Sequence, residues 1–211
     1  LDHDDLWAPT KLLHQLEAIH QAPIVTCLYQ QKMAFEFQSI FAQPRVTLFD
    51  ANETFRMKLA RHWKNVQCTY TSTLMFHASL KHHLFEEHFG LVDYDWFLRL
   101  ANNQKSVQVE IPLVSRGVDG LNLSLNREYR RKDYYFSLMT LELYENEFPA
   151  EVAIARKRLA RSRARYYYKI GDMKEARKYL LKERPGYKEL LYYITTYFGS
   201  NWVRKNFSVF G

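Results

Sequence analysis

Residues 106–116 read SVQVEIPLVSR, and Val107, Val109 and Ile111 recur at every second position. This period of two predicts a β-strand. Upstream, residues 23–30 (PIVTCLYQ) form a short β-branched run that predicts another strand. Residues 68–77 (CTYTSTLMFH) are rich in Thr and aromatic side chains and predict a third.

The segments around these strands have helical patterns. Pro9 suits the first turn of a helix, and Leu12, Leu16 and Ile19 follow with helical spacing, so a helix is predicted to about Gln21. Three further short helices are predicted at residues 50–63, 79–89 and 93–103, with Asp50 or Asn52, Ser79 and Asp93 as their candidate caps.

The chain beyond residue 125 has a different character. From Asn126 onward the pattern is helical, with breaks at 148–149, 171–172 and 185–186. Residues 1–149 carry 15 Lys+Arg and 18 Asp+Glu, a net charge of −3, whereas residues 150–211 carry 15 and 5, a net charge of +10. We therefore predict a mixed α/β region over 1–125 and a basic, all-α extension over 126–211.

Composition limits the class of protein. With 211 residues, 47% hydrophobic and 16% aromatic, the chain can bury a globular core. Its two cysteines, Cys27 and Cys68, predict reduced, buried thiols rather than a disulfide framework. No apolar run is long enough to span a membrane, and the residues after Leu1 are acidic, which is not typical of a secretory signal peptide. We expect a cytoplasmic protein, with the inner face of the membrane as a further location.

The run LDHDDLW (1–7) contains three carboxylates. In an extended chain Asp2 and Asp4 face the same side. Hard cations such as Mg²⁺ and Mn²⁺ take oxygen ligands, usually one or two carboxylates together with substrate phosphates. The alternative interpretation is a solvated acidic terminus or cap charges ahead of Pro9.

A second acidic stretch is FEEHFGLVDYDWFLRLA (85–101). Asp93, at a helix start, is explained either as an N-cap or as a general base at a junction that opens onto a cleft. Asp95, in the first turn, is favoured there by the helix dipole.

Taken in order, these motifs resemble a known family. LD-x-DD-x-W-x-P-x-KL-x-x-Q (1–15) is followed by FEE-x-F (85–89) and VDYDWFLRL (92–100), and then by PLV-x-R (112–116) and NLS (122–124). This order is similar to that of the family 2 glycosyltransferases, which are inverting enzymes of the GT-A type. The resemblance covers residues 1 to about 125.

The resemblance implies a GT-A-like, Rossmann-type core that transfers a sugar from a nucleotide-sugar to an acceptor hydroxyl with inversion. The setting it implies is bacterial cell-surface polysaccharide or glycolipid synthesis. In that scheme Asp2 and Asp4 hold Mg²⁺ or Mn²⁺, and Asp93 is the catalytic base. The remaining implied positions are Asp5, Trp7 and Arg116 for the donor diphosphate and sugar, and Glu87, Asp95 and Trp96 on the acceptor side.

The chain also departs from the family pattern. Val92 and Asp119 stand where the family usually has an acidic residue and a His, and the family's nucleotide-binding βαβ region would precede Asp2. We therefore expect a partial core that lacks this half, either as a fragment or as a truncated gene product. The alternative is an inactive remnant that acts as a binding or dimerisation module. A metal phosphoesterase built on DHDD is a third, less favoured, interpretation.

Residues 156–169 (RKRLARSRARYYYK) hold seven Lys/Arg in 14 positions. They predict an amphipathic basic helix, whose apolar stripe comprises Val152, Ala155, Leu159, Tyr166 and Ile170. Its cationic face is either simply solvated or contacts an anionic membrane surface, which would suit a lipid-linked acceptor; nucleic acid is less favoured.

Two further groups of residues have both a structural and a functional interpretation. The aromatic-rich end, 189–211, predicts packing in the core or in a homo-oligomer, with an exposed docking surface as the alternative. A zinc site at His77, His82, His83 and His88 is less favoured than surface histidines.

Overall fold

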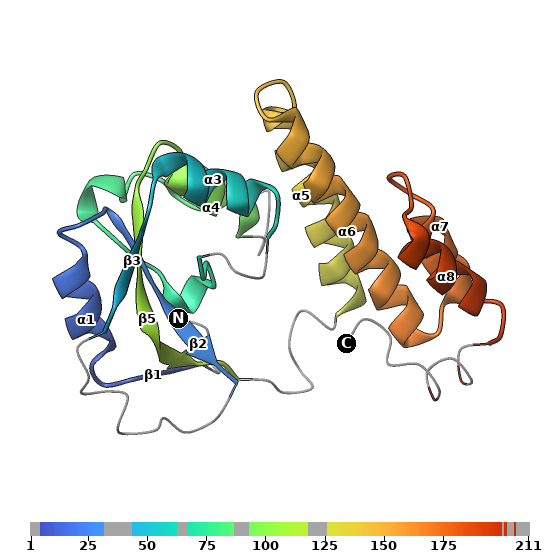
Figure 1. Ribbon diagram of the computed structural model, residues 1–211, viewed down its shortest axis with the longest axis horizontal. Coiled ribbons are helices and arrows are strands. Elements are labelled where there is room, and N and C mark those ends of the chain that lie inside the picture. Colours follow the sequence, from blue (N-terminus) through green and yellow to red (C-terminus); the bar gives the residue numbers. More distant parts are fainter. Residues whose placement is uncertain are drawn as a thin grey trace. The chain divides into compact units, whose positions relative to one another are not determined.

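The computed structural model describes residues 5–31, 44–62, 67–86, 93–117 and 126–199, together with Asn201 and Lys205. The chain divides into two compact units, residues 1–132 and 133–211, and the boundary falls within helix α5 (Arg127–Tyr144). The first unit contains all the described strands together with short helices, and the second contains helices (Figure 1). The protein is therefore of the mixed α/β class.

Strand β5 (Ser106–Ser115) is the centre of a five-stranded sheet. On one side it pairs in parallel with β2 (Ile24–Gln30), which in turn pairs antiparallel with β4 (Met75–Phe76). Two short strands, β1 (Leu6–Trp7) and β3 (Val46–Phe49), pair antiparallel with β5 (Figure 1). The strands predicted over 23–30 and 106–116 are thus confirmed, and they are neighbours.

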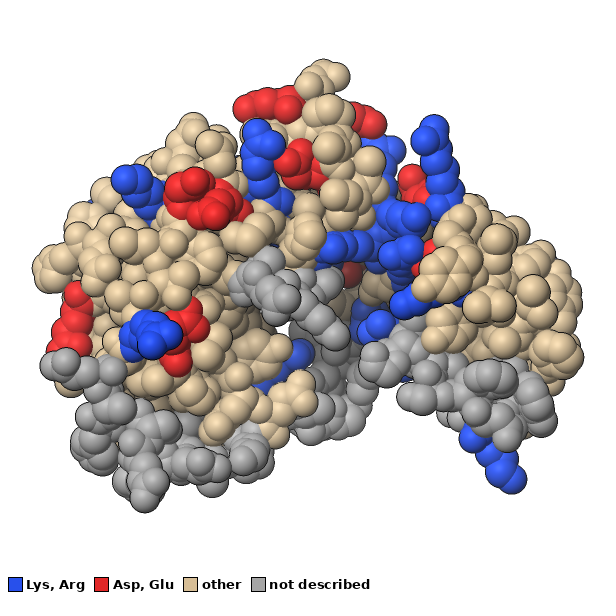
Figure 2. Space-filling model, in the orientation of Figure 1, with Lys and Arg blue, Asp and Glu red and all other residues tan. Residues whose placement is uncertain are grey.

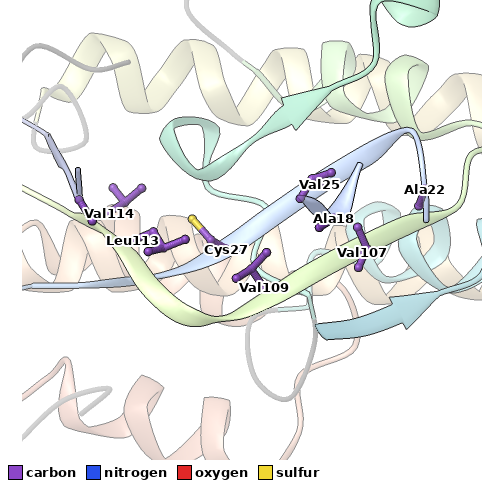
Figure 3. Close-up of a cluster of buried hydrophobic side chains, with 9 residues drawn as sticks. Ala18, Ala22, Val25, Cys27, Val107, Val109, Leu113 and Val114 are labelled. Carbon is purple, nitrogen blue, oxygen red and sulfur yellow. The ribbon is translucent and has the colours of Figure 1, made fainter. Parts of the chain in front are cut away.

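Pro112 interrupts the parallel ladder. Cys27 pairs with Val109, but the next residue of β2, Leu28, pairs with Pro112, so β5 has extra residues at this point. Proline has no N–H to donate and is tolerated inside a sheet mainly at such irregularities. The strand bends between Val109 and Leu113 (Figure 3). On this other side β3 pairs with residues 106–109 and β1 with residues 114–115, before and after the bend.

Helices pack on the sheet through alternate residues of β2. Val25 and Cys27 join a buried cluster with Val107 and Val109 of β5 and Ala18 of α1 (Lys11–Ala18) (Figure 3). Ile24 belongs to a second buried cluster, formed mainly by α4 (Tyr94–Ala101), in which the predicted apolar face of Trp96, Phe97 and Leu100 is buried. Successive strand residues point to opposite faces, so β2 contributes to two cores.

A capping box begins α3 (Ala51–Leu59). The amide of Glu53 donates to Oδ1 of Asp50 at 2.7 Å, and the amide of Asp50 donates to Oε2 of Glu53 at 3.1 Å. Of the two candidate caps, Asp50 is therefore the N-cap. The helix buries Phe55 and Leu59.

Helix α1 has an inverted burial pattern. Lys11, His14 and Gln15 are buried, whereas Leu12 and Leu16 are 48% and 56% exposed. The spacing of the leucines correctly predicted a helix, although it begins at Lys11 and ends at Ala18. An apolar stripe of this kind usually faces the core, but here the polar side faces the sheet.

Two predicted elements differ from the structure over most of their described length. Residues 68–77 form a strand only at Met75–Phe76; before it lies a single 3₁₀ turn, η1 (Thr71–Thr73). Residues 79–86 form no α-helix and hold only the end of a second 3₁₀ turn, η2 (Ala78–Leu80). Strand propensity is a weak predictor because it reflects packing against neighbours, and most of segment 68–77 has no neighbouring ladder.

The second unit contains the predicted helices and breaks. After α5, helix α6 (Pro149–Ile170) begins with Pro at its first position and ends at Gly171, whose φ of 86° is the left-handed cap conformation. Helices α7 (Met173–Leu180) and α8 (Tyr187–Thr195) follow. Tyr167, Tyr168, Met173 and Ala176 form the buried cluster between α6 and α7.

Within the part of the chain that the structure describes, no helix combines the length and the apolar character that crossing a membrane requires.

Candidate functional site

The candidate site lies at the carboxyl ends of the parallel strands β2 and β5. The amide of Arg116, just after β5, donates to the carbonyl of Gln30 at the end of β2 at 2.8 Å. Strand β1 pairs with the last residues of β5, which brings Asp5 to the same edge. Ligand sites in α/β sheets form outside the carboxyl ends of parallel strands.

Asp5 is buried, with 5% of its surface exposed. Its Oδ2 accepts a hydrogen bond from the hydroxyl of Tyr70 at 2.7 Å, and its Oδ1 accepts from the amide of Gly117 at 3.2 Å. A buried carboxylate is tolerated when donors of this kind satisfy it. Asp5 therefore joins the end of β5 to Tyr70.

Arg116 lies beside the same tyrosine. The centre of its guanidinium is 5.1 Å from the ring centroid of Tyr70, a cation–π distance. Tyr29, near the end of β2, contributes a second ring at 5.3 Å from that of Tyr70. The structure thus brings together Asp5 and Arg116, two of the three residues expected to lie near the donor diphosphate and sugar.

Asp93 occupies the N-cap position of α4, but its side chain makes no capping hydrogen bond. Instead Oδ2 accepts from the hydroxyl of Thr71 at 2.7 Å. Among the described residues, Oδ1 has no hydrogen-bond donor, and the residue is half-buried. A helix-capping role therefore does not account for the orientation of the Asp93 side chain.

Tyr70 and Thr71 belong to the segment Gln67–Thr73, which we call the bridging segment. It is tied to the sheet at one end, where the amide of Cys68 donates to Oε1 of Gln108 at 2.6 Å. It is also closed on itself, because the hydroxyl of Thr73 donates to the carbonyl of Tyr70 at 2.6 Å. Hydrogen bonds to side chains and within a turn hold this segment.

The buried polar side of α1 holds the same segment. Nε2 of Gln15 donates to the carbonyl of Thr73 at 2.7 Å, and Nζ of Lys11 donates to Oε1 of Gln15 at 2.6 Å. The Lys11 ammonium lies 3.8 Å from the centroid of the Trp7 ring, and burial lowers the pKa of Lys11. Trp7, expected at the donor side, is therefore the end of a chain of contacts that leads to the bridging segment.

The two cysteines are not disulfide-bonded, and Cys27 is buried. Burial raises the pKa of the Cys27 thiol to about 12, and burial also raises that of Cys68. Sγ of Cys27 lies 3.8 Å from the carbonyl oxygen of Thr73, at the back of the bridging segment. Because the thiolate is the nucleophile, neither side chain is suited to nucleophilic chemistry at neutral pH.

Asp95 and Trp96, expected on the acceptor side, make anchoring contacts to residues 83–86. Oδ2 of Asp95 is 2.8 Å from Nε of Arg99, whose Nη2 donates to the carbonyl of Leu84 at 2.8 Å. Nε1 of Trp96 donates to the carbonyl of His83 at 2.8 Å, and its ring stacks on that of Phe85. Both residues therefore fix the chain that precedes Glu87.

The expected metal ligands Asp2 and Asp4 lie outside the described residues, as does Glu87. Within the described ranges, no group of three or more His, Cys, Asp or Glu side chains could hold a metal ion. His88 of the alternative zinc set and the loop motif NLS (122–124) also fall outside them.

The basic stretch 156–169 lies in α6, and two of its arginines form ion pairs within the helical unit. Val152, Ala155 and Leu159, from its apolar stripe, are buried. Arg156 pairs with Glu145 at 2.8 Å and Arg161 with Glu189 at 2.7 Å.

Sequence reasoning missed Tyr70 and Thr71, which organise the site, and it noted Lys11 and Gln15 only as members of the 1–15 motif, without a role. The i, i+4 spacing of Lys11 and Gln15 allowed an interaction on one helix face. Nothing local distinguished Tyr70 and Thr71 from an ordinary strand.

Comparison of the chain with protein-family models, with curated proteins and with solved structures found no match.

Proposed function

We propose that this chain carries the acceptor-side part of an inverting, nucleotide-sugar-dependent glycosyltransferase with a GT-A-like core. One observation carries the proposal. The two acidic motifs, distant in sequence, are held by adjacent residues, because Tyr70 binds Asp5 and Thr71 binds Asp93. Asp5 and the candidate base therefore converge on one segment, at the end of the sheet where α/β proteins commonly bind ligands.

Asp93 is the candidate general base. Thr71 orients its carboxylate through Oδ2, and Oδ1 has no donor among the described residues. An oxygen in this state can accept the proton of an acceptor hydroxyl while that hydroxyl attacks the anomeric carbon. A single displacement from the face opposite the leaving group inverts the configuration.

The acidic run supplies the donor side. Both oxygens of Asp5 accept hydrogen bonds from the protein, and through them this residue positions the run. Asp2 and Asp4 would hold Mg²⁺ or Mn²⁺, since carboxylates are the ligands that these cations take. When bound, the cation would neutralise charge on the leaving diphosphate. Arg116, stacked on Tyr70, would add a positive charge at the same edge.

A direct test combines metal binding with turnover. Mn²⁺ should broaden the amide resonances of Leu6 and Gly117, which flank and contact Asp5, and Asp2→Asn with Asp4→Asn should abolish this effect. In a protein that combines this chain with a nucleotide-binding half, Asp93→Asn should lower nucleoside diphosphate release from UDP-, GDP- and dTDP-sugars at least 100-fold. The matched control is Asp50→Asn, because Asn also caps helices and Asp50 is exposed. If nucleoside diphosphate release is unchanged in Asp93→Asn, Asp93 is not the catalytic base.

A second candidate function is a binding or dimerisation module without catalysis. The exposed leucines of α1 favour it, since Leu12, Leu13 and Leu16 are 48%, 56% and 56% exposed on one short helix. Contiguous apolar side chains on a surface mark interaction sites. If the wild type is a dimer by sedimentation equilibrium, and Leu13→Glu with Leu16→Glu makes it monomeric while no metal effect is seen, this function replaces the first.

A further inference from the structure

Helix α8 places its apolar side chains on the outside of the helical unit. Tyr187, Leu190, Leu191, Ile194, Tyr197 and Phe198 are exposed, from 45% for Leu190 to 72% for Tyr187. At about 100° per residue, these positions lie on one side of the helix and its C-terminal turn. We call them the α8 stripe.

Polar contacts attach the opposite side of α8 to its neighbours. Glu189 is buried, pairs with Arg161 of α6 at 2.7 Å and accepts from the amide of Gly186 at 2.8 Å. Thr196 is buried too, and its hydroxyl and carbonyl accept from Nη1 of Arg177 in α7 at 3.2 and 3.3 Å. The α8 stripe is therefore not the face by which this helix packs within the chain, so the predicted packing in the core is wrong, and packing in a homo-oligomer stays untested.

Basic side chains flank the α8 stripe. Lys188 is exposed and lies on one side of it by helix geometry. On the other side the Arg177 guanidinium lies 4.5 Å from the ring centroid of Tyr197. Residues 177–205 contain seven Lys+Arg and two Asp+Glu, a net charge of +5, and one of the two acids is the buried Glu189. On the face in Figure 2, Lys and Arg side chains gather mainly along α6, and the surface over α7 and α8 is mostly other residues.

We propose that the α8 stripe docks this protein on an anionic lipid surface, with its apolar side chains among the acyl chains and its basic flanks at the headgroups. Amphipathic helices with a cationic border bind membranes in this way. Tyrosines stand at both ends of the stripe, and such amphipathic rings favour the membrane–water interface.

The basic side chains beside the α8 stripe favour an anionic lipid surface over a second copy of the chain as its partner. A two-fold dimer through the α8 stripe would place the same basic flanks of both copies side by side, and like charges repel. An anionic bilayer complements those flanks. The membrane contact that the sequence predicted at residues 156–169 is therefore placed at α8 instead, because Val152, Ala155 and Leu159 of the apolar stripe of α6 are buried. This contact does not depend on the proposed catalytic function.

Flotation of the full chain with phospholipid vesicles tests the proposal. The wild type should float with vesicles of 70% phosphatidylcholine and 30% phosphatidylglycerol and not with pure phosphatidylcholine. Leu191→Glu combined with Ile194→Glu should lower partitioning at least tenfold. Lys188→Gln should lower it about fivefold, the equivalent of one surface cation. The matched control is Leu143→Glu, because Leu143 is 71% exposed on α5 and should be silent.

Three results would overturn the proposal. The first is a wild type that stays unbound to the anionic vesicles. The second is binding that the Leu191→Glu, Ile194→Glu pair leaves unchanged or that Leu143→Glu reduces equally. The third is a wild-type dimer in sedimentation equilibrium that the same pair converts to a monomer, which would assign the α8 stripe to a second copy. Circular dichroism of each variant should show that it is folded, because the substituted side chains are exposed.

Discussion

The hydroxyl of Thr71 donates to Oδ2 of Asp93 at 2.7 Å, so a residue of the bridging segment sets the orientation of the candidate base. The preceding residue, Tyr70, binds Asp5 in the same way at 2.7 Å. Displacement of the bridging segment would therefore move both acidic motifs together.

Replacing Thr71 tests whether its hydrogen bond orients the candidate base Asp93, while the carboxylate of Asp93 itself is kept. Thr71→Val keeps the shape of the side chain and removes the donor, so we expect nucleoside diphosphate release to fall about tenfold, the equivalent of one hydrogen bond. Thr71→Ser retains the hydroxyl and should restore most of the rate. Initial rates at saturating donor provide the measurement. Equal loss in the Val and Ser variants would show that the methyl group, and not the hydrogen bond, matters.

Tyr70→Phe should destabilise the first unit. It leaves the buried carboxylate of Asp5 with the Gly117 amide as its remaining described donor, which costs about 1.5–3 kcal/mol of unfolding free energy. Urea unfolding followed by tryptophan fluorescence measures this. Tyr29→Phe is the control, because Tyr29 is 40% exposed and should cost under about 0.5 kcal/mol. Similar losses in the two variants would contradict the assigned role of the Tyr70 hydroxyl.

Glu189 should make the stability of the helical unit depend on pH. Burial alone would raise its pKa, but hydrogen bonds from Arg161 and Gly186 outweigh burial and hold the pKa below its ordinary value of 4.5. A depressed pKa contributes stability above the unfolded-state value, and this stability is lost as pH falls through the folded-state value. Glu189→Gln should therefore cost about 1–2 kcal/mol at pH 7, and this cost should shrink below pH 4. Thermal unfolding of both proteins at pH 7, 5 and 3.5 provides the comparison, and a constant difference would refute the linkage.

Arg163 is a buried cation, 5% exposed, whose Nη2 donates to the hydroxyl of Tyr167 at 2.8 Å. Its Nε and Nη1 have no hydrogen-bond partner in the described structure. The rings of Tyr134, Tyr167 and Tyr179 surround it at 4.9–5.8 Å. Because cation–π contacts only partly offset lost hydration, Arg163→Met should be neutral or stabilising by up to about 2 kcal/mol.

Arg163→Ala distinguishes charge from volume at this position. It should cost about 2–4 kcal/mol, because the cavity that it opens among the rings cannot fill. Calorimetric unfolding of the two variants measures both effects. Strong destabilisation by Met as well would show that the guanidinium itself holds the three helices together.

Several features of the fold followed from local sequence. The helix breaks at 148–149, 171–172 and 185–186 were predicted, as was a cap at Asp50 or Asn52, because caps, proline and left-handed glycine act within one turn of the chain. The strands Ile24–Gln30 and Ser106–Ser115 were predicted because β-branched or alternating residues fit a sheet whichever strand lies beside them. The family resemblance also indicated Asp5 and Asp93 as candidate site residues, and their roles stay predictions.

Only the tertiary structure decided what those elements face. Helix α1 turns Leu12 and Leu16 outward because Lys11 and Gln15 are needed to hold the bridging segment, a partner that no local pattern specifies. Segment 68–77 forms a strand only at Met75–Phe76 because, before that point, side chains and its own turn take up backbone groups that a ladder would use. Local patterns record which conformation a segment prefers. Which face is buried, and which donor reaches Asp93, depends on residues that folding brings together from distant parts of the chain.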